Sequence, residues 1–202
     1  MNYFDGSHDF NHIKRVLNIS RQILAEIEST DDTENGPLRT FLRLDPTIIT
    51  LSTLLHDIGD RKYLKEGEDG NTMVRDLLLF LGSGLVLVEK VLAICLGVAY
   101  SSEVQHRAYL ERLIEKYPEL AVIQDADQLD SIGAVGTGRV FTYGAVRIGR
   151  EMEASMEIFG TKLFKLEVMM KTVPGRRLAK KRSERLRVFK AWWSEETEAG
   201  NM

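Results

Sequence analysis

The chain contains a single cysteine, Cys95, which lies in the apolar run VLVEKVLAICLGVAY. One thiol cannot form an intramolecular disulfide, so the fold must depend on packing rather than on covalent cross-links. A chain of 202 residues is long enough to bury a sizeable core without such cross-links. The sequence therefore predicts a single domain over residues 1–202 and suits a reducing compartment, with the cytoplasm as the expected location.

A surplus of positive charge is also lacking. The chain has 27 lysines and arginines against 30 aspartates and glutamates, for a formal net charge of -3. No global basic field of the kind that nucleic-acid binders carry is therefore expected. The most basic segment, GRRLAKKRSERLR at residues 175–187, is interleaved with Leu178 and Leu186. This pattern favours the solvated face of a helix, and we expect no nucleic-acid partner.

Long uninterrupted hydrophobic runs are missing as well. The longest apolar stretch, residues 77–100, is interrupted by Glu89, Lys90 and the Gly-Ser-Gly at 82–84. It indicates two buried helical pieces rather than a membrane span. The first residues, MNYFDGSHDFNH, have neither the basic region nor the apolar core of a signal peptide. We expect a soluble protein with no membrane partner.

Apolar residues recur at helical spacing nearly throughout the chain. Between Asp9 and Glu28 they fall mostly three and four residues apart, as on one face of a helix. A second helix should begin after Asp45, a capping residue, with Pro46 in its first position, and end near Gly59. The segment GVAYSSE leaves room for a small hairpin or a 3₁₀ turn. The predicted fold class is all-α, with further helices over residues 72–81, 84–96, 102–117, 121–132, 152–170 and 174–193.

The apolar run of the second helix ends in two polar residues, His56 and Asp57, within LSTLLHDIGDRKY. An ionised carboxylate that is buried without a partner is costly, so a neighbouring side chain or a metal ion must compensate it. His12 is one of only four histidines and lies three residues before Arg15, so the two share a face of the first predicted helix. A distant acidic cluster, QDADQLD, provides further carboxylates. Together these donors suit Mn²⁺, Fe²⁺, Ni²⁺, Zn²⁺ or Mg²⁺.

The segments HDFNHIKRV, LLHDIGDRKY and VIQDADQLDSIGAVG stand in the order H…HD…D. In this order they resemble the HD-domain superfamily of metal-dependent phosphohydrolases. The stretches SHDFNHIKRV, QDADQLDSIGAVGTGRVFTYG and FGTKLFKLEVMMKTVPGRRLAKKR resemble the YpgQ/YedJ-type branch most closely, over most of the chain. The resemblance implies an all-α HD-type bundle over residues 1–202, with the metal site between core helices.

The resemblance also implies which residues act. It implies one divalent metal ion (Mn²⁺, Mg²⁺, Fe²⁺, Ni²⁺, Co²⁺ or Zn²⁺) held by His12, His56, Asp57 and Asp127. Asp125 stays open as an alternative to Asp127. Such an ion polarises a phosphoryl oxygen and lowers the pKa of bound water. Asp60 is then the candidate that orients or deprotonates the attacking water, while Lys62 and Arg15 are candidates for holding phosphate.

The expected function is that of a metal-dependent phosphohydrolase that acts on a small phosphorylated metabolite, and a nucleotide is the leading candidate for this substrate. The resemblance favours a (d)NTP pyrophosphohydrolase or a nucleotide phosphatase that works by attack of metal-activated water on phosphorus. The alternatives are a non-catalytic metal- or nucleotide-binding module and, among enzymes, a cyclic-nucleotide or alarmone phosphodiesterase. Only His106 remains as a further histidine on the helices between the motifs, so one metal is favoured over two. Tyr100-Ser101 stands where the branch tends to carry a histidine followed by a serine. Whether the protein forms a homodimer stays open.

Overall fold

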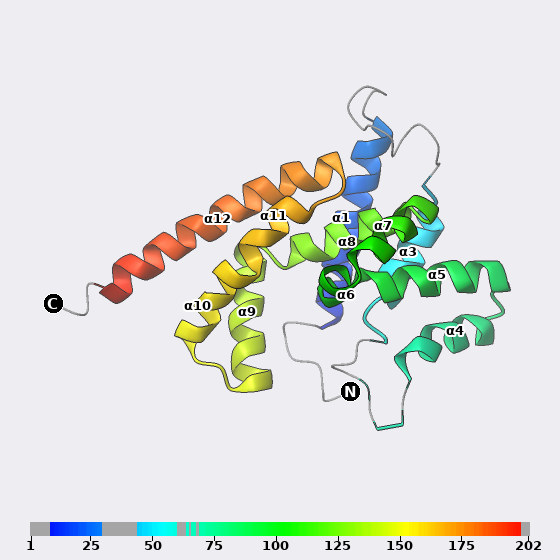
Figure 1. The fold of residues 1–202 in the computed structure, drawn as a ribbon, viewed down its shortest axis with the longest axis horizontal. Helices are drawn as coiled ribbons and strands as arrows, with labels where there is room; N and C mark the ends of the chain where they lie inside the picture. The colour runs from blue at the N-terminus through cyan, green and yellow to red at the C-terminus, as the bar shows by residue number, and fades with distance from the viewer. Residues whose placement is uncertain (1–8, 30–43, 60–63, 65, 68, 199–202) are drawn as a thin grey trace. The chain divides into compact units, whose positions relative to one another are not determined.

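The computed structural model describes residues 9–29, 44–59, 64, 66–67 and 69–198, and this described part contains helices and no strand (Figure 1). The all-α prediction is thereby confirmed. The chain divides into two compact units, residues 16–127 and residues 1–15 with 128–202. Helices α1 (Phe10–Ser29) and α8 (Glu119–Asp130) each contribute residues to both units. The single domain over residues 1–202 stays a prediction.

The unit of residues 16–127 is organised around one helix, α5 (Leu85–Val98). Helix α5 contacts α3 (Pro46–Leu55), α4 (Gly70–Phe80), α6 (Tyr100–Gln105) and α7 (Arg107–Lys116). Figure 1 shows α4 and α5 as a helical hairpin, joined at the Gly-Ser-Gly that interrupts the apolar stretch. The fully buried core of this unit includes Val16, Ile23, Ile49, Val91, Ile94, Leu120 and Ile123.

Two carboxylates lie at the starts of helices in this unit. The Asp45 side chain accepts hydrogen bonds from the backbone amides of Thr47 and Ile48, and Pro46 takes the first helical position, as the sequence predicts. The buried Glu119, in the first turn of α8, accepts from Lys90 Nζ at 2.7 Å and from the Asp45 amide at 3.3 Å. Glu119 therefore connects the starts of α3 and α8 with α5.

The second unit contains α9 (Gly133–Ile148), α10 (Met152–Thr161), the 3₁₀ turn η1 (Leu163–Lys165), α11 (Leu166–Met169) and α12 (Val173–Glu198). Helix α9 packs so closely on α10 that a Cβ on Gly144 would lie 2.7 Å from Ser155 Oγ. Rings of three helices stack, with Phe159 5.8 Å from Phe189 and Phe141 5.6 Å from Trp193. Helix α12 is thus attached by Phe189 and Trp193, whereas the neighbouring Trp192 is exposed.

Several predicted elements differ from the structure. The predicted helix over 102–117 is broken at His106, whose backbone has φ -127 and ψ 37, and the one over 152–170 is broken at Lys162. Helix α3 ends at Leu55, before the predicted end near Gly59. The segment GVAYSSE forms neither a hairpin nor a 3₁₀ turn, because α5 and α6 meet there at a bend at Ala99. Helix α9 is missing from the sequence prediction because its four glycines, at 133, 136, 138 and 144, lower its helix propensity.

No helix in the described ranges has the length and the apolar character that crossing a membrane requires.

Candidate metal centre

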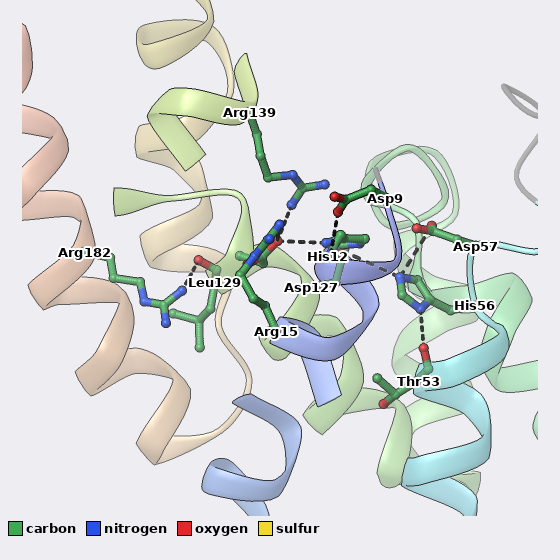
Figure 2. A network of polar contacts seen from close by, with 11 residues as sticks. Asp9, His12, Arg15, Thr53, His56, Asp57, Asp127, Leu129, Arg139 and Arg182 are labelled. Carbon is green, nitrogen blue, oxygen red and sulfur yellow. Dashed lines mark hydrogen bonds and ion pairs between the residues drawn. The ribbon is translucent and has the colours of Figure 1, made fainter. Parts of the chain in front are cut away.

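His56, which follows the last residue of α3, is oriented by its own helix. Its Nδ1 lies 2.8 Å from the carbonyl oxygen of Thr53 (Figure 2). A carbonyl oxygen only accepts hydrogen bonds, so Nδ1 carries the proton and donates it. In the neutral ring, Nε2 therefore holds the lone pair. The side chain is almost completely buried, so this orientation is maintained by packing as well as by the hydrogen bond.

Two carboxylates approach the Nε2 atom of His56. Asp57 Oδ1 lies 3.4 Å and Asp127 Oδ1 3.9 Å from it, both longer than a good hydrogen bond. A lone pair that faces two acceptor oxygens is repelled unless a cation lies among them. Ligand atoms about 2.1 Å from a tetrahedral ion lie about 3.4 Å from one another. The His56–Asp57 distance therefore fits two ligands of one metal ion, and the His56–Asp127 distance is about half an ångström longer than that spacing.

The two carboxylates of this group keep contact with solvent. The side chains of Asp57 and Asp127 are 24% and 20% exposed. Catalytic metal sites leave coordination positions open to water, whereas structural sites are closed by protein ligands. Asp125, two residues before Asp127 on α8, is completely buried, and residues two apart do not share a helix face. The geometry therefore favours Asp127 over Asp125 as a ligand, and the choice stays a prediction.

His12 belongs to the other unit and has a different partner. Its side chain is 1% exposed, and its Nδ1 lies 2.8 Å from Oδ2 of the equally buried Asp130. Asp130 also binds Arg15, through Nε at 2.7 Å and NH2 at 3.1 Å, and Arg139, through NH1 at 2.9 Å. Three side chains, those of His12, Arg15 and Arg139, which Figure 2 labels, thus bind one carboxylate at the end of α8.

The surroundings of Asp130 keep it ionised. Burial alone would raise the pKa of this carboxyl, but the hydrogen bonds from His12 and Arg15 and the charge of Arg139 outweigh burial and hold the pKa well below its usual range. In return, the hydrogen bond to Asp130 raises the pKa of the Arg15 guanidinium. Arg15 therefore lies on a protein carboxylate, with its side chain 32% exposed. Its predicted phosphate contact stays a prediction.

The C-terminal helix contributes a further arginine to this region. Arg182 of α12 donates from NH1 to the carbonyl oxygen of Leu129, in the last turn of α8. Gly133, the first residue of α9, has φ +79 and lies against the Arg182 side chain, where a Cβ would come 3.3 Å from the Arg182 Cβ and Cγ. The sequence prediction placed Arg182 on a solvated helix face, which is wrong for this residue because its side chain is partly buried.

Asp60 and Lys62 lie outside the described residues, so their predicted roles stay predictions. The ends of the segment that carries them are nevertheless close together. A Cβ on Gly59 would lie 2.5 Å from the carbonyl oxygen of Gly70, which real Cβ atoms do not tolerate. Glycine is therefore needed at Gly59, where the chain leaves the His56-Asp57 turn, and at Gly70, where α4 begins, because a Cβ on either would collide with the backbone of the other.

The order of these groups along the chain, a histidine on α1, a His-Asp pair after α3 and aspartates on α8, matches a family model described as HD domain over residues 9–132. The chain belongs to the HD domain family. The matched HD region contains all four predicted metal ligands and Asp130. Arg139 and Arg182 lie beyond its end.

Known proteins support this HD assignment over more of the chain. YpgQ of Bacillus subtilis is 29% identical over 184 residues, which cover 88% of this chain and 78% of YpgQ. The crystal structure of Bacillus subtilis YpgQ in complex with ADP superposes with a TM-score of 0.71 at 25% identity, over 94% of this chain and 90% of that one. A structure of an HD-superfamily hydrolase from Bacillus thuringiensis gives a TM-score of 0.64 at 27% identity, over 95% and 87%. The resemblance to the YpgQ-type branch is confirmed.

Two residues of this region were not assigned a role from the sequence. Asp130 is recognisable only as one of several aspartates in QDADQLD, although its spacing of three from Asp127 places both on one side of α8. Arg139 has no sequence signal, because an arginine among helical residues ordinarily indicates a solvated position. In the structure its side chain is only 10% exposed.

Proposed function

We propose that this HD protein is a metal-dependent phosphohydrolase that binds one divalent ion through His12, His56, Asp57 and Asp127. The convergence of His56 Nε2 with the Asp57 and Asp127 oxygens carries the proposal. His12, His56 and Asp57 also each offer a ligand atom suited to a metal ion. Both histidines use Nδ1 for a protein hydrogen bond, which leaves Nε2 as the ligand atom. Imidazole and carboxylate donors suit Mn²⁺, Fe²⁺, Co²⁺, Ni²⁺, Zn²⁺ and Mg²⁺.

The chemistry follows from this donor set. A divalent ion held there polarises a phosphoryl oxygen and lowers the pKa of water at its open positions. Phosphoryl transfer otherwise requires positioning and neutralisation of charge. Arg15 can supply part of that neutralisation from its exposed edge, and Asp60 and Lys62 keep their predicted roles in orienting water and holding phosphate.

A nucleotide is the proposed substrate. The structure of YpgQ in complex with ADP supports this choice, because that protein has the same fold over most of its length. Within this class we favour release of pyrophosphate from a (deoxy)nucleoside triphosphate or of phosphate from a nucleotide. The non-catalytic binding module is less favoured, because the partly exposed Asp57 and Asp127 leave a metal open to water.

The test is a nucleotide panel assayed for phosphate and pyrophosphate after chelation and after readdition of each metal. The His56→Ala variant should lose metal-restored release completely. His106→Ala is the matched control, because His106 is exposed, and it should keep the wild-type rate. Metal-restored release that survives in His56→Ala, or stoichiometric metal binding without release from any nucleotide, would refute the proposed activity.

A further inference from the structure

We propose that Asp130 is a positioning residue that fixes the tautomer of His12, and that Arg139 holds Asp130 in the orientation this requires. The proposal builds on the proposed role of His12 as a metal ligand. It assigns a function to a residue outside the four ligands and to an arginine beyond the region that the HD model matches.

The first step concerns the proton between His12 and Asp130. Arginine side chains only donate hydrogen bonds, and both oxygens of Asp130 receive them: Oδ1 from Arg15, and Oδ2 from Arg15 and Arg139. The carboxylate is therefore an acceptor, and the 2.8 Å contact to His12 must be donated by Nδ1–H. A neutral imidazole with the proton on Nδ1 presents its lone pair at Nε2.

The second step concerns how firmly the carboxylate is held. Oδ2 accepts from His12 Nδ1 at 2.8 Å, from Arg15 NH2 at 3.1 Å and from Arg139 NH1 at 2.9 Å, while Oδ1 accepts from Arg15 Nε at 2.7 Å. Rotation of the carboxylate would break several of these bonds at once. Both Asp130 and His12 are 1% exposed, so water cannot readily replace the lost partners. The pair is thus locked in one arrangement.

The third step concerns Arg139. It reaches Asp130 from α9, across nine positions of sequence, with a side chain 10% exposed. Its NH1 binds the same oxygen that accepts from His12. Without this donor the Asp130 carboxylate can rotate. The His12 imidazole should then be less well oriented, and the affinity for metal should fall. Carboxylate partners of metal-ligating histidines typically contribute about 10–100-fold to metal affinity.

The experiment reads the tautomer directly, by long-range ¹H–¹⁵N correlation of the His12 ring in the full-length, metal-free protein at a pH above the histidine titrations. The wild type should show the proton on Nδ1. Asp130→Asn should show a mixed or reversed tautomer, because an amide can donate to Nδ1, and bind Mn²⁺ about 10–100-fold more weakly. Asp76→Asn, at an exposed position on α4, is the matched control and should change neither.

Arg139 is tested by Arg139→Ala and Arg139→Lys, beside Arg107→Ala at a position 83% exposed. Arg139→Ala should weaken Mn²⁺ binding several-fold, Arg139→Lys should restore part of it, and Arg107→Ala should leave it unchanged. A purely structural role would lower the melting temperature and leave the His12 tautomer and the Mn²⁺ affinity of the folded variants unchanged.

Two results would overturn the inference. The first is a wild-type His12 protonated on Nε2, which needs no variant and decides the matter even if Asp130→Asn does not fold. The second is Mn²⁺ affinity of folded Asp130→Asn within twofold of the control. Failure of the proposed function looks different: the wild type itself would bind no divalent ion at His12, while its tautomer would still be as inferred.

Discussion

His56 and His12 are each oriented by a hydrogen bond at Nδ1. His56 donates from Nδ1 to the Thr53 carbonyl one helical turn earlier, and His12 donates to Asp130, more than a hundred residues later. The first contact is local and follows from the end of a helix. The second depends on tertiary structure, so it cannot be read from the sequence around His12.

The choice between two neighbouring aspartates gives a prediction. Asp127→Asn should lower metal affinity by about 10-fold or more, because an amide is a weaker ligand than a carboxylate for a divalent ion. Asp125→Asn should keep metal stoichiometry and lower the melting temperature, because Asp125 is completely buried and the amide must replace an acceptor there. Equilibrium dialysis and thermal unfolding separate the two effects. Loss of metal from Asp125→Asn, with metal binding by Asp127→Asn unaffected, would show that Asp125 is the ligand and Asp127 is not.

Cys95 gives a prediction that is independent of the metal. Burial raises the pKa of its thiol to about 12, and Sγ lies 3.6 Å from the Ser52 carbonyl. Only the thiolate reacts rapidly with alkylating reagents. The native protein should therefore stay unmodified by iodoacetamide at pH 8 and become modified on unfolding, as followed by mass spectrometry. Rapid alkylation of the native protein would show that the thiol is accessible there.

A partly buried ion pair connects helices of residues 16–127. Glu119 joins Lys90 of α5 to the amide of Asp45 at the start of α3. Glu119→Gln should reduce the free energy of unfolding by roughly 1–3 kcal/mol, because it removes the charge that Lys90 pairs with. Lys90 is 27% exposed, so it can recover some hydration, which keeps the loss at this size.

Urea unfolding measures this loss, with Glu89→Gln as the matched control at an exposed position next to Lys90. The control should unfold like the wild type, within about 0.5 kcal/mol. Equal stability of Glu119→Gln and the control would mean that the ion pair contributes nothing.

Element prediction succeeded where local rules decide and failed where they do not. Asp45 and Pro46 mark the start of α3 correctly, because capping is a property of a few adjacent residues. Apolar spacing continues across His106 and Lys162, so it does not reveal the breaks there. The glycines of α9 conceal a helix, and for Gly144 the reason is tertiary, because a Cβ there would collide with Ser155 of α10.

At the scale of the whole molecule, the HD match ends at residue 132 while the described chain continues to residue 198. The motifs predict the ligand types and the family, because a His-Asp pair and its partners keep their order in the sequence. The arginines at 139 and 182, which touch the last turn of α8, are not predictable. The basic segment 175–187, which the sequence predicts to be a solvated face, includes Arg182, whose side chain is turned toward the protein.

The central claim is that one divalent ion is bound by His12, His56, Asp57 and Asp127. Anomalous diffraction from crystals of the Mn²⁺-loaded protein tests it most directly. The account predicts one strong peak about 2.0–2.3 Å from Nε2 of both histidines and from one oxygen of each aspartate. A peak at other residues, or no peak in protein saturated with Mn²⁺, would contradict it.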